Sequence, residues 1–333
     1  MGTPDFAVPC LEALAEAKRF TDGWQHELVA VVTQPDKPRG RSGKPACSPV
    51  KEAALRYEIP VYQPKRVRTE DFLTTLRGLQ PDVIVVVAFG QILPQTLLDI
   101  PRYGCLNVHG SLLPAYRGAA PIQWAVINGE KTSGVTVMQM DAGIDTGDIL
   151  LTKEIALSPK ETGGSLFEKL SHLGAEALLE AFRRLEAGTL QPMKQGEATT
   201  AYASMLEKEM GELDFTRPAA ELERLIRGLN PWPSAYTWLG EKMLKIWDAD
   251  VAEPELAGAK AESEAKKTER EGNLGTVSSV GTINYVGKEG FTVICGEGAL
   301  LVREVQLSGK KRMAAGDFLR GYSLQKGQKL GRE

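Results

Sequence analysis

Short apolar runs rich in β-branched residues alternate with an amphipathic segment in the first third of the chain. The runs span residues 28–33, 83–88 and 105–109, and residues 48–57 repeat apolar positions at helical spacing. Such alternation is typical of βαβ units, whose crossover connections leave neighbouring strands mostly parallel. Ligands of these sheets bind in the loops that leave the carboxyl ends of the strands, so we expect the chemistry there.

The pattern changes near residue 190, which indicates two domains. Residues 166–185 repeat apolar positions at helical spacing and stop near Gly188, and a polar stretch, 191–200, follows. A chain of 333 residues also exceeds the usual size of one domain. We therefore predict a first domain over residues 1–189, a linker over 190–204 and a second domain over 205–333.

Short strands dominate the second domain in this interpretation. Residues 252–273 are rich in Glu, Lys, Ala and Gly and cannot easily bury a face, so we expect a loop. We predict an α/β, Rossmann-like first domain with a mostly parallel sheet, followed by a small OB-like β-barrel. The strands predicted for the barrel are 236–239, 243–248, 275–280, 282–286, 291–295 and 300–305.

Composition narrows the class of protein without fixing its function. With 42% hydrophobic and 25% charged residues the chain has globular composition, and its net charge of −3 means that a nucleic acid would need a local basic patch. The four cysteines show no Cys-x-x-Cys spacing, so we expect reduced thiols and no metal. No apolar run approaches the ~20 residues of a membrane span and no secretory signal is visible, so we predict a cytoplasmic protein without a membrane partner.

Polar residues with catalytic potential are densest after the third apolar run, in the segment 107–114 (Asn-Val-His-Gly-Ser-Leu-Leu-Pro). Residues two apart in a strand point to the same side, so Asn107 and His109 should project together. Amide and imidazolium donors aimed at one point stabilise the oxyanion that forms when an acyl or formyl group moves to an amine. Taken alone, an Asn-x-His pair is more often a buried strand end that satisfies local backbone groups.

A glycine-flanked acid lies further along the chain, in the segment 143–148 (Gly-Ile-Asp-Thr-Gly-Asp). Glycines around an acid let a loop bend tightly and aim the carboxylate. If Asp145 reaches His109, it would orient the ring and favour its protonated form. The alternative is that both acids of this segment only close a turn.

Together these segments carry a family resemblance. Residues 107–114, continued by 116–123 and joined to 143–148, closely resemble the folate-dependent formyltransferases, and the resemblance covers nearly the whole chain. It implies that a formyl group passes from 10-formyltetrahydrofolate, as co-substrate, to the α-amino group of methionyl initiator tRNA, without a metal. The supporting matches are residues 1–9, 34–38, 48–51, 309–313 and 318–321.

The resemblance also implies roles for single residues. Asn107, His109 and Asp145 match the family's catalytic positions. Ser111, Leu112, Leu113 and Pro114 match its tetrahydrofolate-binding segment, and residues 137–142 should line the same cleft. The part of the pocket wall that receives the pteridine is matched by Phe89, Gly90, Gln91, Ile92 and Leu93.

Two basic segments are the candidates for contact with the tRNA. Residues 37–44 form a basic loop, which from charge alone is more simply a solvated surface loop; the resemblance implies that it enters the acceptor end of the tRNA. A second cluster lies in the predicted barrel and would provide another contact. The residues concerned are Arg39, Arg41 and Lys44 in the loop and Lys310, Lys311 and Arg312 in the barrel.

Other interpretations compete with this one. A nicotinamide enzyme would need a Gly-x-Gly-x-x-Gly turn, whereas the first turn reads Gly-Thr-Pro-Asp over residues 2–5. A purine-pathway formyltransferase resembles only the catalytic half, and a protein that only binds would not need all three catalytic positions filled. We further expect a monomer, and we expect the first strand of the family's sheet to be missing ahead of residue 1.

Overall fold

Two compact units make up the protein. The computed structural model describes residues 1–17, 26–38, 45–253 and 280–332. The first unit comprises Met1–Ile122, Lys131–Leu157 and Ser165–Ser204, and the second comprises Gln123–Glu130, Ser158–Gly164 and Met205–Glu333. Residues 190–204, which we predict to be a linker, thus lie within the first unit, and two short segments from the predicted first domain belong to the second.

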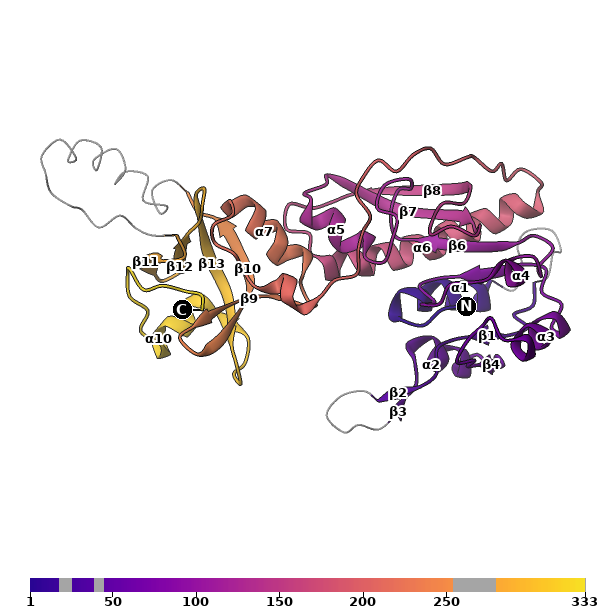
Figure 1. The fold of residues 1–333 in the computed structure, drawn as a ribbon, viewed down its shortest axis with the longest axis horizontal. Coiled ribbons are helices and arrows are strands. Elements are labelled where there is room, and N and C mark those ends of the chain that lie inside the picture. Colours follow the sequence, from indigo (N-terminus) through magenta and orange to yellow (C-terminus); the bar gives the residue numbers. More distant parts are fainter. Residues whose placement is uncertain (18–25, 39–44, 254–279, 333) are drawn as a thin grey trace, which may run out of the picture. The chain divides into compact units, whose positions relative to one another are not determined.

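The sheet of the first unit combines parallel and antiparallel strands (Figure 1). Strand β1 (Val31–Val32) pairs in parallel with β4 (Val61–Tyr62), and β5 (Ile84–Val86) pairs in parallel with β6 (Cys105–His109). Strands β7 (Thr132–Gln139) and β8 (Ile149–Ala156) continue from β6 in antiparallel fashion. The connection between β7 and β8 is too short for the crossover that a parallel return requires, so these strands reverse direction.

Residues 1–3 connect the two parallel pairs. Gly2 N–H donates to Val32 O at 3.0 Å and Val87 N–H donates to Met1 O at 2.9 Å, with Gly2 and Val87 paired in parallel. An apolar cavity of about 160 Å³ lies next to them, lined in part by residues 28–32 and 83–85. Strand β1 is shorter than the predicted strand 28–33, because only Val31 and Val32 pair with β4.

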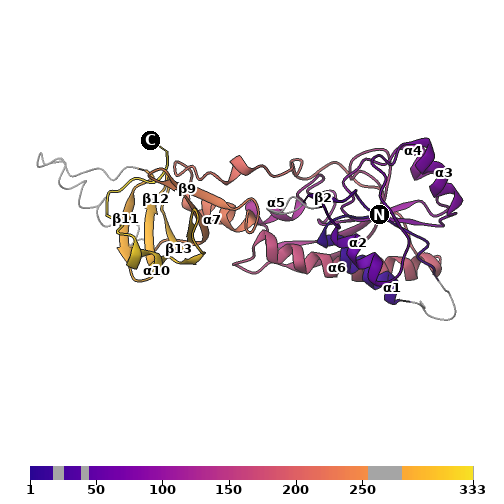
Figure 2. The same ribbon diagram turned by 90° about the horizontal axis from the view of Figure 1, so that it is seen from below.

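Helices cover both faces of the sheet, and the side view in Figure 2 separates them. On one face, Gly174 of α6 (Gly163–Glu186) approaches Val108 and Cys10 of α1 (Val8–Glu16). On the other face, α3 (Glu70–Gly78) and α4 (Gln95–Leu98) share a buried core with β5 and with Cys105 of β6. Side chains alternate along a strand, so Asn107 and His109 point to the same face as Cys105.

Local sequence signals fix the ends of two helices in the first unit. Helix α2 (Pro49–Arg56) begins with proline in its first turn, and the Ser48 hydroxyl accepts the Lys51 N–H at 3.1 Å. The Ser48 hydroxyl satisfies one of the free N–H groups that a helix start leaves, and proline, which has no N–H, removes another. The chain leaves α6 through Gly188, whose φ of 64° favours glycine. The remaining elements are the 3-10 helix η1 (Asp5–Ala7), helix α5 (Pro121–Ile127) and the hairpin of β2 (Lys37–Pro38) with β3 (Pro45–Ala46).

An antiparallel sheet forms the second unit, with strands in the order β11-β12-β13-β10-β9 and β14 attached to β13. Helix α7 packs against β10 and β13, and helix α10 packs against β12 and β13, where Phe318 is fully buried. The bounds are η2 Lys208–Gly211, α7 Ala219–Gly228, β9 Ala235–Leu239, β10 Lys242–Val251, β11 Ile283–Gly287, β12 Gly290–Ile294, β13 Ala299–Leu307, β14 Met313–Ala314 and α10 Ala315–Gly321.

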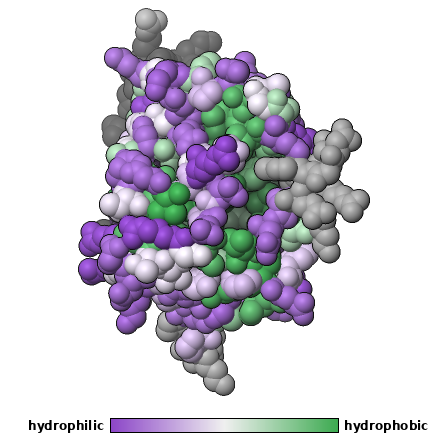
Figure 3. Space-filling model, turned by 90° about the vertical axis from the view of Figure 1, so that its right-hand side faces the viewer, coloured by the Kyte–Doolittle hydropathy of each residue, from purple (hydrophilic) through white to green (hydrophobic). Residues whose placement is uncertain are grey.

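The predicted architecture is confirmed at this level: a mixed α/β unit with parallel strands comes first, and an antiparallel unit follows. The predicted strand 275–280 and the predicted loop 252–273 lie almost wholly outside the described residues. Among the described helices, none combines the length and the apolar character needed to cross a bilayer. Polar side chains cover most of the face drawn in Figure 3, with apolar side chains gathered in a few patches between them.

Candidate active site

Strand β6 brings Asn107 and His109 to one side of the sheet, as the sequence predicts. Asn107 lies opposite Val86 of β5 and Met138 of β7, and His109 lies opposite Thr136. The His109 side chain is almost fully buried, whereas Asn107 is half-buried. No hydrogen bond to the Asn107 amide comes from the part of the chain that the structure describes, so this amide is free to bind a ligand.

The His109 ring lies between two acceptors of unequal strength. Its Nε2 atom is 2.9 Å from Tyr116 O, and because a carbonyl oxygen only accepts, Nε2 carries the proton of this bond. Its Nδ1 atom lies 3.7 Å from Asp145 Oδ1. That distance is too long for a direct hydrogen bond, so the contact is electrostatic. The contact with the carboxylate is therefore the looser of the two.

Asp145 is held from several directions. The Asp145 backbone has a φ of 54°, and its side-chain Oδ2 accepts the Gly118 N–H at 2.9 Å. The Gln195 side-chain amide donates to Asp145 O at 3.0 Å and to Gly147 O at 2.6 Å. Asp145 is thus aimed by a segment close in space but distant in sequence.

Gly147 and Gly118 allow this loop to approach its neighbours. A Cβ atom added at Gly147 would lie 1.7 Å from Gln139 O, and one added at Gly118 would lie 2.6 Å from Ala203 O. Real Cβ atoms do not come this close to backbone oxygen, so any larger residue would displace the loop. The two glycines consequently allow the close backbone contacts that hold the Asp145 carboxylate in its position.

The predicted folate-binding segment, Ser111 to Pro114, is fastened to strand β7. The Thr136 hydroxyl donates to Ser111 O at 2.7 Å and accepts the Leu113 N–H at 3.0 Å. The Leu113 side chain packs with Met138 and Ile149 in a buried cluster, whereas Leu112 and Pro114 are half-buried. A ligand at this segment would therefore meet backbone groups, Leu112 and Pro114, while Leu113 supports the loop from below.

The predicted pteridine wall, Phe89 to Leu93, is also partly core. Phe89 and Leu93 are buried in the same cluster as α3 and α4, whereas Ile92 is 79% exposed. The Phe89 carbonyl accepts the Thr3 hydroxyl at 3.0 Å and the Gln34 amide at 3.2 Å. The backbone near Gly90, together with Ile92, is the part of this segment that remains available to a ligand.

Comparisons with known proteins show the family to which the chain belongs. A family model described as "Formyl transferase" matches residues 2–182, and one described as "Formyl transferase, C-terminal domain" matches residues 205–323. The methionyl-tRNA formyltransferase of Lachnospira eligens is 54% identical over 331 residues, covering 99% of this chain and 98% of the relative. The chain belongs to the formyl transferase family. Another relative, the methionyl-tRNA formyltransferase of Geotalea daltonii, is 47% identical and covers 99% of this chain and 97% of its own length.

Solved structures show the same formyl transferase fold. WlaRD, a sugar 3N-formyl transferase studied with dTDP and 5-N-formyl-THF, has a TM-score of 0.60 at 18% identity, over 93% of this chain and 97% of that chain. An N-formyltransferase from Helicobacter canadensis, in complex with folinic acid and dTDP-3-aminofucose, has a TM-score of 0.60 at 17% identity, over 94% and 97%. The predicted family is confirmed, and the chain is an enzyme of the transferase class.

Several residues that complete this formyl transferase site were not singled out by the sequence. Tyr116 and Gly118 lie in the matched run 116–123, but their use of backbone groups leaves no signal in residue type. Gln195 falls in the polar stretch that we predict to be a linker, and it joins Asp145 to Arg117, whose guanidinium donates to Gln195 Oε1 at 2.8 Å. Contacts across such sequence separations are not visible in local patterns.

The predicted RNA-binding loop of the first unit is described only at its base. Arg39, Arg41 and Lys44 lie outside the described residues. At the base, Lys51 Nζ donates to Asp36 Oδ2 at 2.6 Å and to Gln63 Oε1 at 2.8 Å. The hydrogen bond from Lys51 holds the pKa of the Asp36 carboxyl below its usual range. The base of the loop is thus held by a polar network of Asp36, Lys51 and Gln63.

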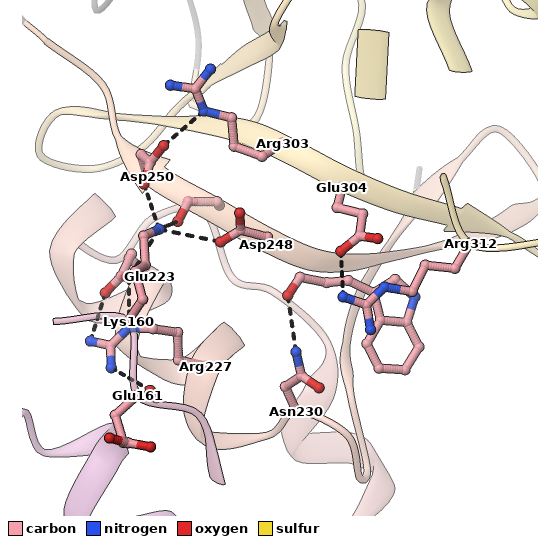
Figure 4. A network of polar contacts seen from close by, with 12 residues as sticks. Lys160, Glu161, Glu223, Arg227, Asn230, Asp248, Asp250, Arg303, Glu304 and Arg312 are labelled. Atoms are coloured by element: carbon pink, nitrogen blue, oxygen red, sulfur yellow. Dashed lines mark hydrogen bonds and ion pairs between the residues drawn. The ribbon is translucent and has the colours of Figure 1, made fainter. Parts of the chain in front are cut away.

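The three predicted cations of the C-terminal formyl transferase domain differ in their surroundings. Arg312 pairs with Glu304, and its guanidinium lies 4.7 Å from the centre of the Trp247 ring (Figure 4). Lys310 and Lys311 are exposed, and no ion pair to either comes from a described residue. The lysines are therefore available to a phosphate, whereas Arg312 is already engaged within the protein.

A second polar network in Figure 4 centres on Lys160. Its ammonium pairs with Asp250 and lies 3.2 Å from Asp248 Oδ1 and 3.9 Å from Glu223 Oε1. Arg303 reaches the same Asp250 at 2.7 Å. This network fastens the segment Ser158–Gly164 to strand β10 within the second unit.

Proposed function

We propose that this formyl transferase moves the formyl group of 10-formyltetrahydrofolate to the α-amino group of methionyl initiator tRNA, giving N-formylmethionyl-tRNA for translation initiation. The observation that carries the proposal is similarity at 54% identity across 99% of the chain to a methionyl-tRNA formyltransferase. That similarity includes residues 205–323, the span of the C-terminal family model, and is not confined to the catalytic half.

The site supports transfer through a tetrahedral oxyanion. The neutral amine attacks the formyl carbon, a C–N bond forms, and the carbonyl oxygen gains negative charge. In this scheme the Asn107 amide and the Nδ1 side of His109 donate to that oxygen, and such fixed donors are usually the largest contribution to acyl-transfer catalysis. The scheme is supported by the position of Asn107 on β6 and by the 3.7 Å between His109 Nδ1 and Asp145 Oδ1. The Nε2 atom stays on Tyr116 O, which keeps the ring in one orientation.

Asp145 serves the proton transfers in this scheme. The attacking amine loses a proton, N10 of the folate gains one as the C–N10 bond breaks, and a water between His109 and Asp145 would relay between them. General acid–base help of this kind contributes ~100- to 10,000-fold. Alignment of the two substrates contributes further to the rate acceleration, because an amine attacks the formyl carbon only from a restricted direction.

The folate and tRNA contacts complete the proposal. The backbone of Ser111 to Pro114, with the exposed part of Phe89 to Leu93, would hold the pteridine, a flat ring that needs apolar walls and a few fixed hydrogen bonds. The buried cluster of Leu113, Met138 and Ile149 gives that loop a rigid support. We assign the second unit the role of an OB-like tRNA-binding barrel, with Lys310 and Lys311 toward phosphate, and the loop bearing Arg39, Arg41 and Lys44 the role of gripping the acceptor end.

A panel of amine acceptors tests the proposal. Labelled 10-formyltetrahydrofolate is incubated with the protein and with charged initiator tRNA, charged elongator tRNA, free methionine or a small amine such as glycinamide ribonucleotide. Label should appear on charged initiator tRNA and far less on the others. The fold shared with sugar N-formyltransferases makes a small amine the second candidate, and label on the small amine alone would establish it.

A further inference from the structure

A cluster of unpaired cations lies beside the predicted pteridine wall in the first unit. Lys65, Arg66 and Arg68 follow strand β4 in the loop that leads to α3, and all three are exposed. None of the described residues forms an ion pair with any of them. Exposed cations are common, so these three indicate a binding site only if their loop is fixed next to a known or predicted site.

The loop is attached to the predicted pteridine wall, Phe89 to Leu93, by three contacts. The Val67 N–H donates to Gln91 Oε1 at 3.0 Å, and Gln91 Nε2 donates to Pro64 O at 3.4 Å. The Val67 side chain, 1% exposed, packs in the same buried cluster as Phe89 and Leu93. The backbone that presents the cations is therefore rigidly placed with respect to the segment from Phe89 to Leu93.

An open hollow lies between these cations and helix α3. Lys65, Arg66 and Thr69 line it, and Phe72 and Pro64 give it an apolar floor. Asp71 also lines it and lowers its positive charge, whereas the nearby Glu70 is neutralised by Arg77 at 2.7 Å. Two cations line the hollow against one carboxylate, and Arg68 adds a third exposed cation in the same loop. The surface is therefore positive, which suits a ligand that carries several carboxylates.

We infer that Lys65, Arg66 and Arg68 bind the glutamate tail of the folate co-substrate. The inference rests on the proposed function, because that function supplies a donor whose pteridine end binds at Phe89 to Leu93. The other end of a folate is a p-aminobenzoylglutamate, which carries two carboxylates and gains one with each further γ-linked glutamate. An aromatic ring followed by several negative charges matches an apolar floor followed by several cations.

RNA phosphate is the competing occupant. Gln63 precedes the cations and donates to Asp36 Oδ1 at 2.7 Å, at the base of the hairpin that carries the basic loop. The observations favour the folate tail because Gln91 and Val67 tie the cations to the pteridine wall itself, and because the hollow has a floor that a phosphate backbone would not use. The experiment below separates the two.

Equilibrium binding of 5-formyltetrahydrofolate with one or five glutamates, measured without tRNA, tests the inference. The wild-type protein should bind the pentaglutamate roughly tenfold more tightly at low salt, as expected from a few exposed ion pairs, and this ratio should shrink at high salt. In the triple variant Lys65→Gln, Arg66→Gln, Arg68→Gln the ratio should fall close to one. The single variant Arg66→Glu should lower the ratio as well.

A matched control and separate readouts keep the outcomes distinct. The triple variant Arg102→Gln, Lys131→Gln, Arg183→Gln removes the same charge from exposed positions of the first unit and should keep the wild-type ratio. An unchanged ratio in the first triple variant, or a ratio of one in the wild type, would overturn the inference. A raised KM for tRNA with an unchanged folate ratio would assign the cations to RNA. Tail-dependent folate binding without formyl transfer to tRNA would instead contradict the proposed function.

Discussion

The His109 ring is held more firmly on one side than on the other. Its Nε2 bond to Tyr116 O, at 2.9 Å, has hydrogen-bond length, whereas Nδ1 and Asp145 are separated by 3.7 Å. A backbone carbonyl thus sets the orientation of the ring. Gly118 and Gln195 in turn position Asp145 on the other side of the ring.

Gln195→Ala tests such a positioning role. The substitution removes both hydrogen bonds to the Asp145 loop, each worth ~1 kcal/mol, so kcat should fall about tenfold while the KM for folate changes less. The thermal midpoint should fall by only a few degrees, because each lost hydrogen bond contributes ~1 kcal/mol and the side chain is half-exposed. Gln191→Ala, in the same segment but exposed, is the control. Equal kcat values for the two variants would remove Gln195 from the account.

The cysteines offer a test by thiol chemistry. Burial raises the pKa of the Cys10 and Cys105 thiols to about 12 and that of Cys295 to about 11. At pH 8 only about one in a thousand or fewer of these groups is a thiolate, so they should react with a disulfide reagent only after unfolding. Cys47 is half-buried and should supply the fast phase, which Cys47→Ser should abolish. A fast phase that persists in Cys47→Ser would show that a buried thiol is accessible.

At the scale of single residues, the sequence predicted part of the site from the periodicity of a β-strand. The period of two along a strand places Asn107 and His109 together, and the structure agrees. That Asp145 would reach His109 followed from the family resemblance, since nothing local in its loop indicates the partner. Tyr116 and Gln195 could not be predicted, because one acts through its backbone and the other bridges segments about 50 residues apart in sequence.

Among the elements, strand β7 organises the site. Thr136 pins the segment Ser111 to Leu113, and the strand pairs with β6 beside Asn107 and His109. The sequence predicted β6 with its observed bounds, Cys105–His109. The reversal of β7 and β8 was not predicted, since strand direction depends on the connection and not on the strand's own residues.

Thr136→Val tests the link between β7 and the predicted folate segment. The isosteric change leaves the buried Leu113 N–H without its acceptor, which should lower the free energy of unfolding by ~1–3 kcal/mol and weaken folate binding. Thr132→Val, at an exposed position of the same strand, should change neither quantity measurably. Denaturant unfolding and folate titration measure the two effects. Unchanged unfolding in Thr136→Val would mean that the loop is held by something else.

For the molecule as a whole, the two units carry separable tasks in the proposed function. The first holds Asn107, His109 and Asp145, and the second presents Lys310 and Lys311 without internal ion pairs from described residues. The sequence predicted both units because their periodicities differ. It could not predict that residues 123–130 and 158–164 join the second unit, since that depends on contacts such as those of Lys160 with Asp248 and Asp250.

Lys310→Gln with Lys311→Gln tests the RNA-binding task of the second unit. The KM for tRNA should rise several-fold, and the slope of log KM against log salt should fall by up to ~2, because each phosphate contact contributes about 0.9. The KM for folate should not change. Lys242→Gln with Lys288→Gln removes equal charge from exposed positions of the same unit and should leave the KM for tRNA unaltered. An unaltered tRNA KM in the first double variant would exclude these lysines from the interface.

Single-turnover transfer of labelled formyl from 10-formyltetrahydrofolate to methionyl initiator tRNA tests the central claim most directly. The wild-type protein and Asp148→Asn, an acid of the same loop that pairs with the exposed Lys194, should transfer the label at similar rates. Asp145→Asn should transfer it ~100- to 10,000-fold more slowly with an unchanged fold. No label on the tRNA with the wild-type protein, or equal rates for Asp145→Asn and the wild type, would contradict the account.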